Sequence, residues 1–384
     1  MAVNRKLVQG TAVLSVNLFA GQIIGLIYAI LGTRYFSPSE YGKIMSGVAT
    51  SMIAATLLDF GFSQESLRRQ ISDSSFRFEF SRNRLATIAL LGGAAVTGLY
   101  VLGSGISLAA VPLIGIAWHF SVLATIPYRA ELKFTELSVR SSFGRLLGFT
   151  IAAISLFLNP NTFVYVSGFA SIYIFEAFFL LYFGKRRYPL QRNSDLIPSM
   201  RSSLAAVLPV IQSLDVLAIR LASPAAAGYY SAVNKWPAAL GSFVTALNLA
   251  NFSNHLKSGS NKYWQRDLAP FYTIIVLISL TTLFLSGTLI NLILPASYFG
   301  SLNSFRILIL VSLITFWNQV YFSRFIAKGL HGPLILIYTI WTTCQIFLLF
   351  YVTKNHTLEK ALWSLLTIQI LMLVSFIITD RERS

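Results

Sequence analysis

Long apolar segments recur along the whole chain, and they limit its possible folds more than any other feature. A helix needs about 20 mostly apolar residues to cross the roughly 30 Å hydrocarbon core of a bilayer. Only 11% of the residues are charged and 55% are hydrophobic, whereas soluble domains average about 25% charged residues. Backbone polar groups inside a bilayer must be satisfied within the chain, which favours helices. We therefore expect an all-α polytopic membrane protein.

Twelve segments have the length and composition of a membrane-spanning helix. We place them near residues 7–33, 41–62, 84–103, 106–128, 140–159, 163–184, 199–221, 226–250, 268–290, 303–323, 334–352 and 357–379. The loops on the side of the N-terminus carry 22 Lys and Arg residues, those on the other side carry five, and three fall inside spans. By the positive-inside rule, both termini are predicted to lie in the cytoplasm. The formal charge of +16 then reflects topology, so we expect membrane lipids and no nucleic acid as partners.

One short turn occurs twice in the chain. Residues 34–42 are RYFSPSEYG and residues 220–228 are RLASPAAAG. Arg, Ser, Pro and Gly recur at one offset of 186 residues, nearly half of the 384-residue length. Each half contains six predicted spans, so both halves have the same orientation. We predict two six-helix lobes, residues 1–190 and 191–384, related by a parallel internal repeat about an axis along the membrane normal.

The residues around the two turns carry a family resemblance. They are Tyr41-Gly42, Asp59-Phe60-Gly61 and Arg68-Arg69 in the first half, and Asp215, Gly228-Tyr229-Tyr230 and Lys235 in the second. These stretches resemble Wzx-type polysaccharide flippases of the multidrug/oligosaccharidyl-lipid/polysaccharide exporter (MOP) superfamily.

The resemblance implies two helical bundles enclosing a central cavity that opens alternately to each side of the bacterial inner membrane. The substrate would be a lipid-linked (polyprenyl-diphosphate) oligosaccharide for O-antigen, capsule or exopolysaccharide biosynthesis. Other polysaccharide-assembly proteins are candidate partners, and no cofactor is expected.

A carrier of such a glycolipid needs cations inside the membrane, a polar wall for the sugars and a gap for the lipid tail. Charged residues in spans are rare and costly, so they are candidates by default. Lys235 lies about eight residues into its helix, roughly 12 Å from the end, and an ion pair with Asp215 is the structural alternative. The other cavity candidates are Arg145, Arg306, Asn234, Trp118, His119 and Trp236. The two arginines can instead snorkel to headgroups, and the aromatic residues can instead belong to bundle cores or interfacial belts.

Three acidic residues in spans, Asp59, Glu176 and Asp215, are candidates for gating or for binding a coupling proton or sodium ion. Asp59 can alternatively anchor the basic loop that contains Arg68 and Arg69. The single cysteine provides no disulfide framework, and the four histidines show no spacing typical of a metal site.

Two other functions stay open at this point. A drug or cation exporter of the same superfamily would have an acid-lined cavity, whereas bases and acids inside the spans balance here. A membrane-embedded glycan-modifying enzyme would need an acid, a base or a nucleophile at a surface site. The chain offers no carboxylate pair or histidine cluster with a suitable spacing, so we expect a transporter and not an enzyme.

Overall fold

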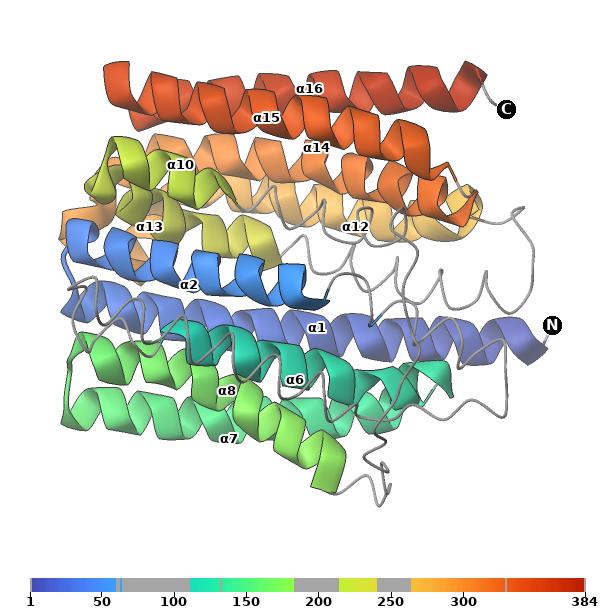
Figure 1. The fold of residues 1–384 in the computed structure, drawn as a ribbon, viewed down its shortest axis with the longest axis horizontal. Helices are drawn as coiled ribbons and strands as arrows, with labels where there is room; N and C mark the ends of the chain where they lie inside the picture. Colours follow the sequence, from blue (N-terminus) through green and yellow to red (C-terminus); the bar gives the residue numbers. More distant parts are fainter. Residues whose placement is uncertain are drawn as a thin grey trace. The chain divides into compact units, whose positions relative to one another are not determined.

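The apolar segments form helices in the computed structural model, which describes residues 2–59, 63, 111–131, 133–182, 214–239, 264–328 and 330–382. All regular secondary structure in these residues is helical (Figure 1). The labelled elements are α1 (Ala2–Tyr35), α2 (Pro38–Asp59), α6 (Val111–Ala130), α7 (Phe134–Leu158), α8 (Thr162–Tyr182), α10 (Asp215–Ala222), α12 (Trp264–Phe284), α13 (Ser286–Ile293), η2 (Ala296–Ser301), α14 (Leu302–Ala327), α15 (His331–Asn355) and α16 (Leu358–Glu382). Residues 224–239 are also helical.

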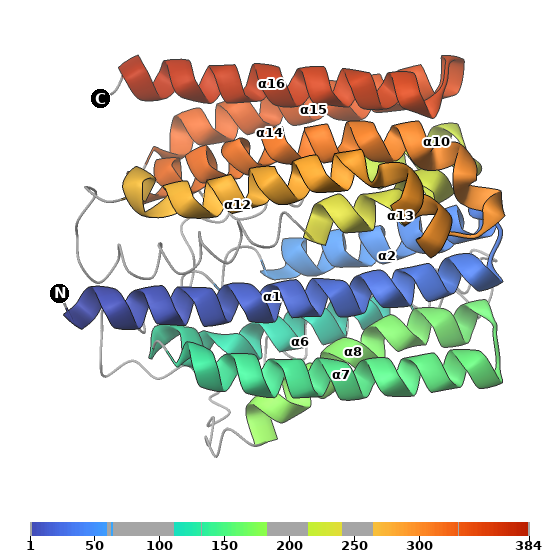
Figure 2. The ribbon, with the colours of Figure 1, turned by 180° about the vertical axis from the view of Figure 1, so that it is seen from behind.

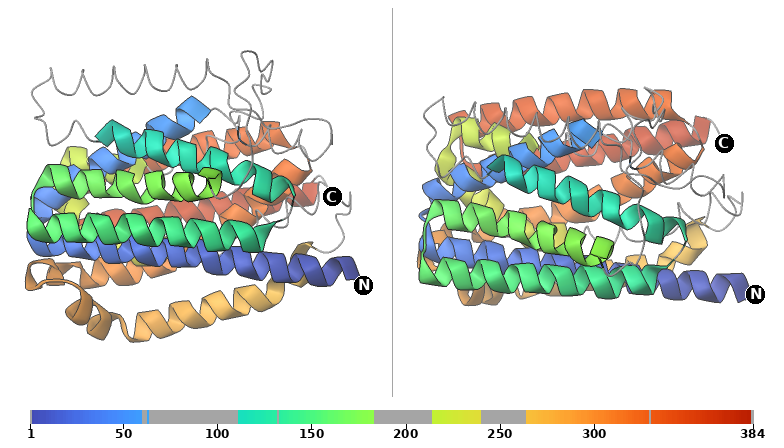
Figure 3. Two further views of the ribbon diagram at one scale, coloured as in Figure 1. Left: turned by 90° about the horizontal axis from the view of Figure 1, so that it is seen from below. Right: turned by 60° about the horizontal axis from the view of Figure 1, so that its bottom comes forward.

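The helices confirm the predicted all-α membrane fold. Among the described residues, α6, α7, α8, α15, α16 and the segment Ala296–Ile326 are long and apolar enough to cross a bilayer. The predicted span 268–290 is divided at Leu285 into α12 and α13, which are bent by 72° relative to each other (Figure 3). The chain is therefore an all-α polytopic membrane protein, and its described part contains one pair of helices bent at a break.

Several predictions fall outside the described residues. They concern the span 84–103, the first part of the span 199–221, the last part of the span 226–250, the basic loop with Arg68 and Arg69, and the lobe boundary near residue 190. The helices pack into two compact units, one of residues 1–24 and 47–210, the other of residues 25–46 and 211–384. The helices α1 and α2 thus contribute residues to both units, and the boundary between the predicted lobes stays a prediction.

In the first unit, α7 and α8 lie side by side at very short range (Figure 2). A Cβ atom on Gly144 would lie 2.6 Å from the Glu176 Cα atom, and one on Gly148 would lie 2.6 Å from the Ile172 Cα atom. Only glycine allows the two backbones to approach so closely, as is common between helices in membranes. This packing holds the middle of α8 firmly against α7.

In the second unit, buried amides join α14, α15 and α16, which pack side by side (Figure 2). The Asn318 Nδ2 atom donates a 2.8 Å hydrogen bond to the Gln369 Oε1 atom, and the Gln369 Nε2 atom donates a 3.0 Å bond to the Gln345 Oε1 atom. At the C-terminal ends of α14 and α16, the Lys328 Nζ atom lies 2.8 Å from the Asp380 Oδ1 atom. Hydrogen bonds of this kind stabilise helix contacts where hydrophobic attraction is weak.

Each copy of the repeated turn starts a helix with a serine cap. The Ser37 amide and hydroxyl both donate hydrogen bonds to the Glu40 carboxylate, at 3.1 and 2.8 Å, and the Glu40 amide donates to the Ser37 Oγ atom at 3.4 Å. This reciprocal pattern is a capping box, and its hydrogen bonds hold the pKa of Glu40 below its ordinary value. In the second copy the Ala226 amide donates to the Ser223 Oγ atom at 3.2 Å. Alanine replaces the glutamate there, so only the serine half of the box remains.

The two copies of the turn also pack against each other within the second unit. A Cβ atom on Gly42 would collide with the backbone of Pro224 and lie 2.7 Å from the Gly228 amide nitrogen. A Cβ atom on Gly228 would collide in the same way with the backbone of Pro38. The contact is reciprocal, because the glycine of each copy lies on the proline of the other. The recurrence seen in the sequence is therefore also a structural contact.

We expect the substitution Gly228→Ala to destabilise the protein. The added methyl group would meet backbone atoms, which cannot move aside cheaply, and overpacking of this kind typically costs about 1–3 kcal/mol. Thermal unfolding of the purified protein in detergent measures the effect. Gly287→Ala is the control, because its Cβ atom would meet no described atom within 4 Å. Equal melting temperatures for the two variants would contradict the reciprocal contact.

Candidate functional site

The first unit contains a buried ion pair between two of the predicted site residues. The Arg145 Nη2 atom lies 2.6 Å from the Glu176 Oε1 atom, and the Glu176 side chain is completely buried. The Ser121 and Ser141 hydroxyls also donate to the Glu176 carboxylate, at 2.6 and 2.5 Å. A buried carboxylate is tolerated in hydrocarbon only when its charge is compensated and its oxygens are hydrogen-bonded. Both conditions are met, so Arg145 is occupied by an internal partner and does not extend to the headgroups.

The first half of α1 packs onto this ion pair. The Ser142 hydroxyl donates a 2.7 Å hydrogen bond to the Asn17 Oδ1 atom, and the Asn17 amide lies 3.5 Å from the Ser141 Oγ atom. One turn further, a Cβ atom on Gly21 would lie 2.9 Å from the Arg145 Cζ atom. The glycine therefore leaves the space that the guanidinium fills. Four helices, α1, α6, α7 and α8, therefore meet at this ion pair.

Two further candidates meet at a second place in the same unit. The His119 Nδ1 atom lies 3.7 Å from the Asp59 Oδ1 atom, and the histidine side chain is 1% exposed. Asp59 also accepts hydrogen bonds from the Ser63 hydroxyl, at 2.6 Å, and from the Ser63 amide, at 3.3 Å. These bonds support its interpretation as an anchor for the chain that follows α2. Trp118 is partly buried beside His119 on α6.

In the second unit, Lys235 is a partly buried cation on the helix of residues 224–239. It forms no ion pair and no hydrogen bond with any residue that the structure describes. The structural alternative, an ion pair with Asp215, is not present. Instead, the Asp215 carboxylate accepts hydrogen bonds from the Tyr230 hydroxyl and, at 2.6 Å, from the Val216 amide. Lys235 thus differs from Arg145, whose charge is compensated inside the protein.

Asn234 belongs to the network around Asp215 and not to the surroundings of Lys235. Its Nδ2 atom lies 3.3 Å from the Tyr230 hydroxyl oxygen, which in turn bonds the carboxylate. The network joins α10 to the helix of residues 224–239, on either side of the second repeated turn. Asp215 makes no ion pair with a described residue. Hydrogen bonds are therefore the only polar contacts of its carboxylate among the described residues.

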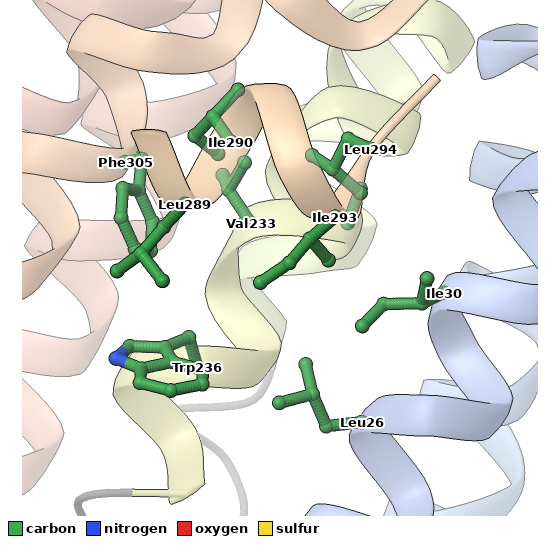
Figure 4. Close-up of a pocket in the computed structure, with 10 residues that line it drawn as sticks. Leu26, Ile30, Val233, Trp236, Leu289, Ile290, Ile293, Leu294 and Phe305 are labelled. Atoms are coloured by element: carbon green, nitrogen blue, oxygen red, sulfur yellow. The ribbon is translucent and has the colours of Figure 1, made fainter. Parts of the chain in front are cut away.

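The remaining two candidates are Trp236, which lines a small apolar pocket of the second unit (Figure 4), and Arg306 on α14. The indole ring of Trp236 lines the pocket, and its Nε1 atom donates to the Thr282 Oγ1 atom at 3.3 Å. Arg306 follows Phe305, which also lines the pocket, and its Nε atom donates a 2.9 Å hydrogen bond to the Ser286 Oγ atom. Within the described residues, no group of three His, Cys, Asp or Glu side chains could hold a metal ion.

From the sequence, Arg145 and Glu176 were separate candidates, and Tyr230 was not predicted as the partner of Asp215. Ser141 and Arg145 are four residues apart on α7, so helical spacing could have placed them on one face. The spacing along one helix does not say which residue of another helix lies opposite. Tyr230 is part of the family-like stretch Gly228-Tyr229-Tyr230, and this was the only signal for it.

No protein-family model matches the chain, and no curated protein matches its sequence. Solved structures do match its fold. A structure of MATE in complex with MaD3S is 12% identical, with a TM-score of 0.70, over 98% of this chain and 95% of that chain. An outward-facing multidrug resistance MATE family transporter of the MOP superfamily is 12% identical, with a TM-score of 0.69, over 97% and 95%.

A third structure, a MOP superfamily transporter from Pyrococcus furiosus, is 13% identical, with a TM-score of 0.63, over 97% and 95% of the two chains. It is described as having a binding pocket of reversed polarity that suggests a different function. The chain therefore has the fold of MATE transporters. The low identities establish the fold alone.

We expect Glu176→Gln to destabilise the protein strongly, because Arg145 would remain buried without a compensating charge. Removing one partner of a buried ion pair costs about 3–5 kcal/mol. The double variant with Arg145→Gln should regain most of this loss, since it removes both charges. Thermal unfolding in detergent measures all three proteins.

Glu136→Gln provides the matched control on α7. Glu136 pairs with Arg140 at 2.6 Å, but the two side chains are 35% and 23% exposed, and exposed pairs contribute about 0–1 kcal/mol. If Glu176→Gln and Glu136→Gln lowered stability equally, the buried pair would not be the constraint that its geometry indicates.

Proposed function

We propose that the chain is a flippase that moves a polyprenyl-diphosphate-linked oligosaccharide across the bacterial inner membrane by alternating access. Its product would serve the synthesis of a surface polysaccharide such as O-antigen, capsule or exopolysaccharide. The shared fold supports transport in general, because the structures that match it are transporters. The choice of substrate rests on the charged groups of the second unit.

Lys235 is the observation that carries this proposal. A cation held inside a membrane span is costly unless it is compensated, and no described residue compensates it. An anionic substrate would supply the missing charge whenever it binds. A diphosphate is well suited to this role, because charge-assisted hydrogen bonds to phosphate oxygens are the strong ones. A cationic drug would instead be repelled by this group.

Arg145 is a weaker candidate than Lys235 for direct contact with phosphate. Its guanidinium is engaged by Glu176 and covered by the backbone at Gly21. We propose that this pair stabilises the first unit and that Arg306, which is exposed and bonded only to a serine among the described residues, assists Lys235. The aromatic faces of Trp118 and Trp236 would stack against sugar rings.

Asp215 is the carboxylate best placed to respond to a coupling proton or sodium ion. Glu176 is already neutralised by an arginine, and Asp59 lies beside His119. Asp215 has only hydrogen-bond donors as partners in the described residues. We further propose that both termini lie in the cytoplasm, because the basic loops alternate with loops of little charge.

We expect Lys235→Ala to reduce transport strongly and Lys235→Arg to retain it. Hydrogen bonds to charged groups contribute about 1.5–3 kcal/mol, so losing the cation should reduce flux roughly 10- to 100-fold. The measurement is surface-glycan display in a host that lacks its own flippase, complemented with each variant at matched membrane expression. Lys354→Ala is the control, because Lys354 is an exposed cation at the end of α15.

If Lys235→Ala displayed as much glycan as Lys354→Ala, Lys235 would not be the substrate contact. If the wild-type chain restored no glycan with several cognate pathways, the flippase function itself would be rejected. Protection of cells against cationic drugs would then identify the drug/cation exporter as the function.

A further inference from the structure

A cluster of charged residues lies at one end of the second unit, where α14 and α16 end and α15 begins (Figure 2). The carboxylate of Asp380, on α16, lies between two cations at the end of α14. Its Oδ2 atom is 3.0 Å from the Arg324 Nη2 atom, and its Oδ1 atom is 2.8 Å from the Lys328 Nζ atom. The side chains of Arg324 and Lys328 are 26% and 22% exposed, so both are accessible at the surface of the unit.

The cluster has more positive than negative charge. Arg324 and Lys328 share the single carboxylate of Asp380, and neither makes an ion pair with any other described residue. Arg381 directly follows Asp380, is exposed, and makes no ion pair with a described residue. Because a cation at a membrane surface attracts anionic lipid, the uncompensated charge at this end is available to an anionic group.

An exposed apolar stripe on α16 leads to this cluster. Leu371, Val374 and Ile378 follow one another at helical spacing, so they lie on one face of α16. They are 42%, 44% and 52% exposed, and Arg381 continues the same spacing. Since α16 is long and apolar enough to cross a bilayer, this face is suited to contact with hydrocarbon chains, and the cations at its end are suited to the level of the headgroups.

We propose that the cationic cluster and the apolar stripe of α16 together bind one anionic phospholipid of the bilayer. The lipid phosphate contacts Arg324, Lys328 and Arg381, and an acyl chain lies along the stripe. Basic sites between membrane helices on the cytoplasmic side bind anionic headgroups, and the orientation that we propose places this end in the cytoplasm. Asp380 competes with the phosphate for two of the cations. The inference does not depend on the transported substrate, so it applies equally to a flippase and to a drug exporter.

The carboxylate and the cations give predictions of opposite sign. Asp380→Asn removes the competing negative charge, so we expect it to strengthen binding of anionic lipid roughly fivefold, the effect of one unit charge near a membrane surface. The triple variant Arg324→Gln/Lys328→Gln/Asp380→Asn removes the excess charge of the pair and should weaken binding roughly fivefold. It leaves no buried carboxylate without a partner, so it keeps the packing of α14 on α16.

Binding is measured on the purified full chain in mixed micelles of detergent and phosphatidylcholine. A dansyl-labelled phosphatidylglycerol is titrated in, and energy transfer from the tryptophans gives the half-saturating mole fraction. Lys354→Gln/Lys360→Gln is the matched control, because it removes two exposed cations from the opposite ends of α15 and α16. We expect this control to bind the probe as the wild-type protein does, and thermal unfolding verifies that each variant is folded.

A competition experiment separates a lipid from a soluble phosphate. Unlabelled phosphatidylglycerol should displace the probe, whereas glycerol phosphate, a water-soluble form of the headgroup, should leave it bound. Displacement by both compounds at similar concentrations would overturn the assignment to a lipid.

The variants test whether binding occurs at this surface. Tighter binding in Asp380→Asn together with weaker binding in the triple variant supports the proposal. Equal binding in the wild type and both variants, or weaker binding in Asp380→Asn, would mean that the cluster only joins α14 to α16. If the lysine control lost as much affinity as the triple variant, binding would follow the total charge of the protein, and the proposed site would be rejected.

Discussion

Inside hydrocarbon, the hydrophobic effect contributes little free energy when one apolar helix packs on another, because lipid tails are equally apolar. Close backbone approach and polar contacts must therefore hold the helix bundle together. Both devices are present in this chain. Gly144 and Gly148 bring the backbones of α7 and α8 together, and Asn318 and Gln369 join α14 to α16. The same requirement governs the charges, because a charge that enters such a bundle needs compensation. Arg145 and Glu176 meet that requirement by pairing with each other.

The buried charges are compensated differently in the two units, and this difference separates structural from candidate functional residues. In the first unit Arg145 and Glu176 neutralise one another, and serine hydroxyls saturate the carboxylate. Such a pair is self-sufficient and contributes to the architecture. In the second unit Lys235 and Asp215 are not paired with each other, although both belong to the family-like stretch of sequence. Because the two charges are not paired with each other, Lys235 can bind an anionic substrate and Asp215 can bind a proton or a cation.

Much of this fold was predictable, because span length and the distribution of charge are properties of single segments. The predicted helices recur wherever the structure describes them, apart from the bend at Leu285. The pair Ser286-Gly287 directly after Leu285 is a sequence signal for such a bend. Contacts between helices were not predictable in the same way. Helical periodicity places Arg145 on a face but does not reveal that Glu176 lies opposite. The partner of Asp215 was hidden for a similar reason, because Tyr230 lies beyond the turn that separates two helices.

The reciprocal contact of Gly42 and Gly228 carries a consequence for the origin of the chain. Each glycine lies on the proline of the other copy, which is the arrangement expected at an interface with two-fold symmetry, where residue i touches residue j and j touches i. A half-length ancestor with a single Ser-Pro turn could have made this contact with a second copy of itself. Fusion of the two genes would have turned a dimer interface into an internal joint. The joint itself would not require the capping box, because the second copy has Ala226 where the first has Glu40.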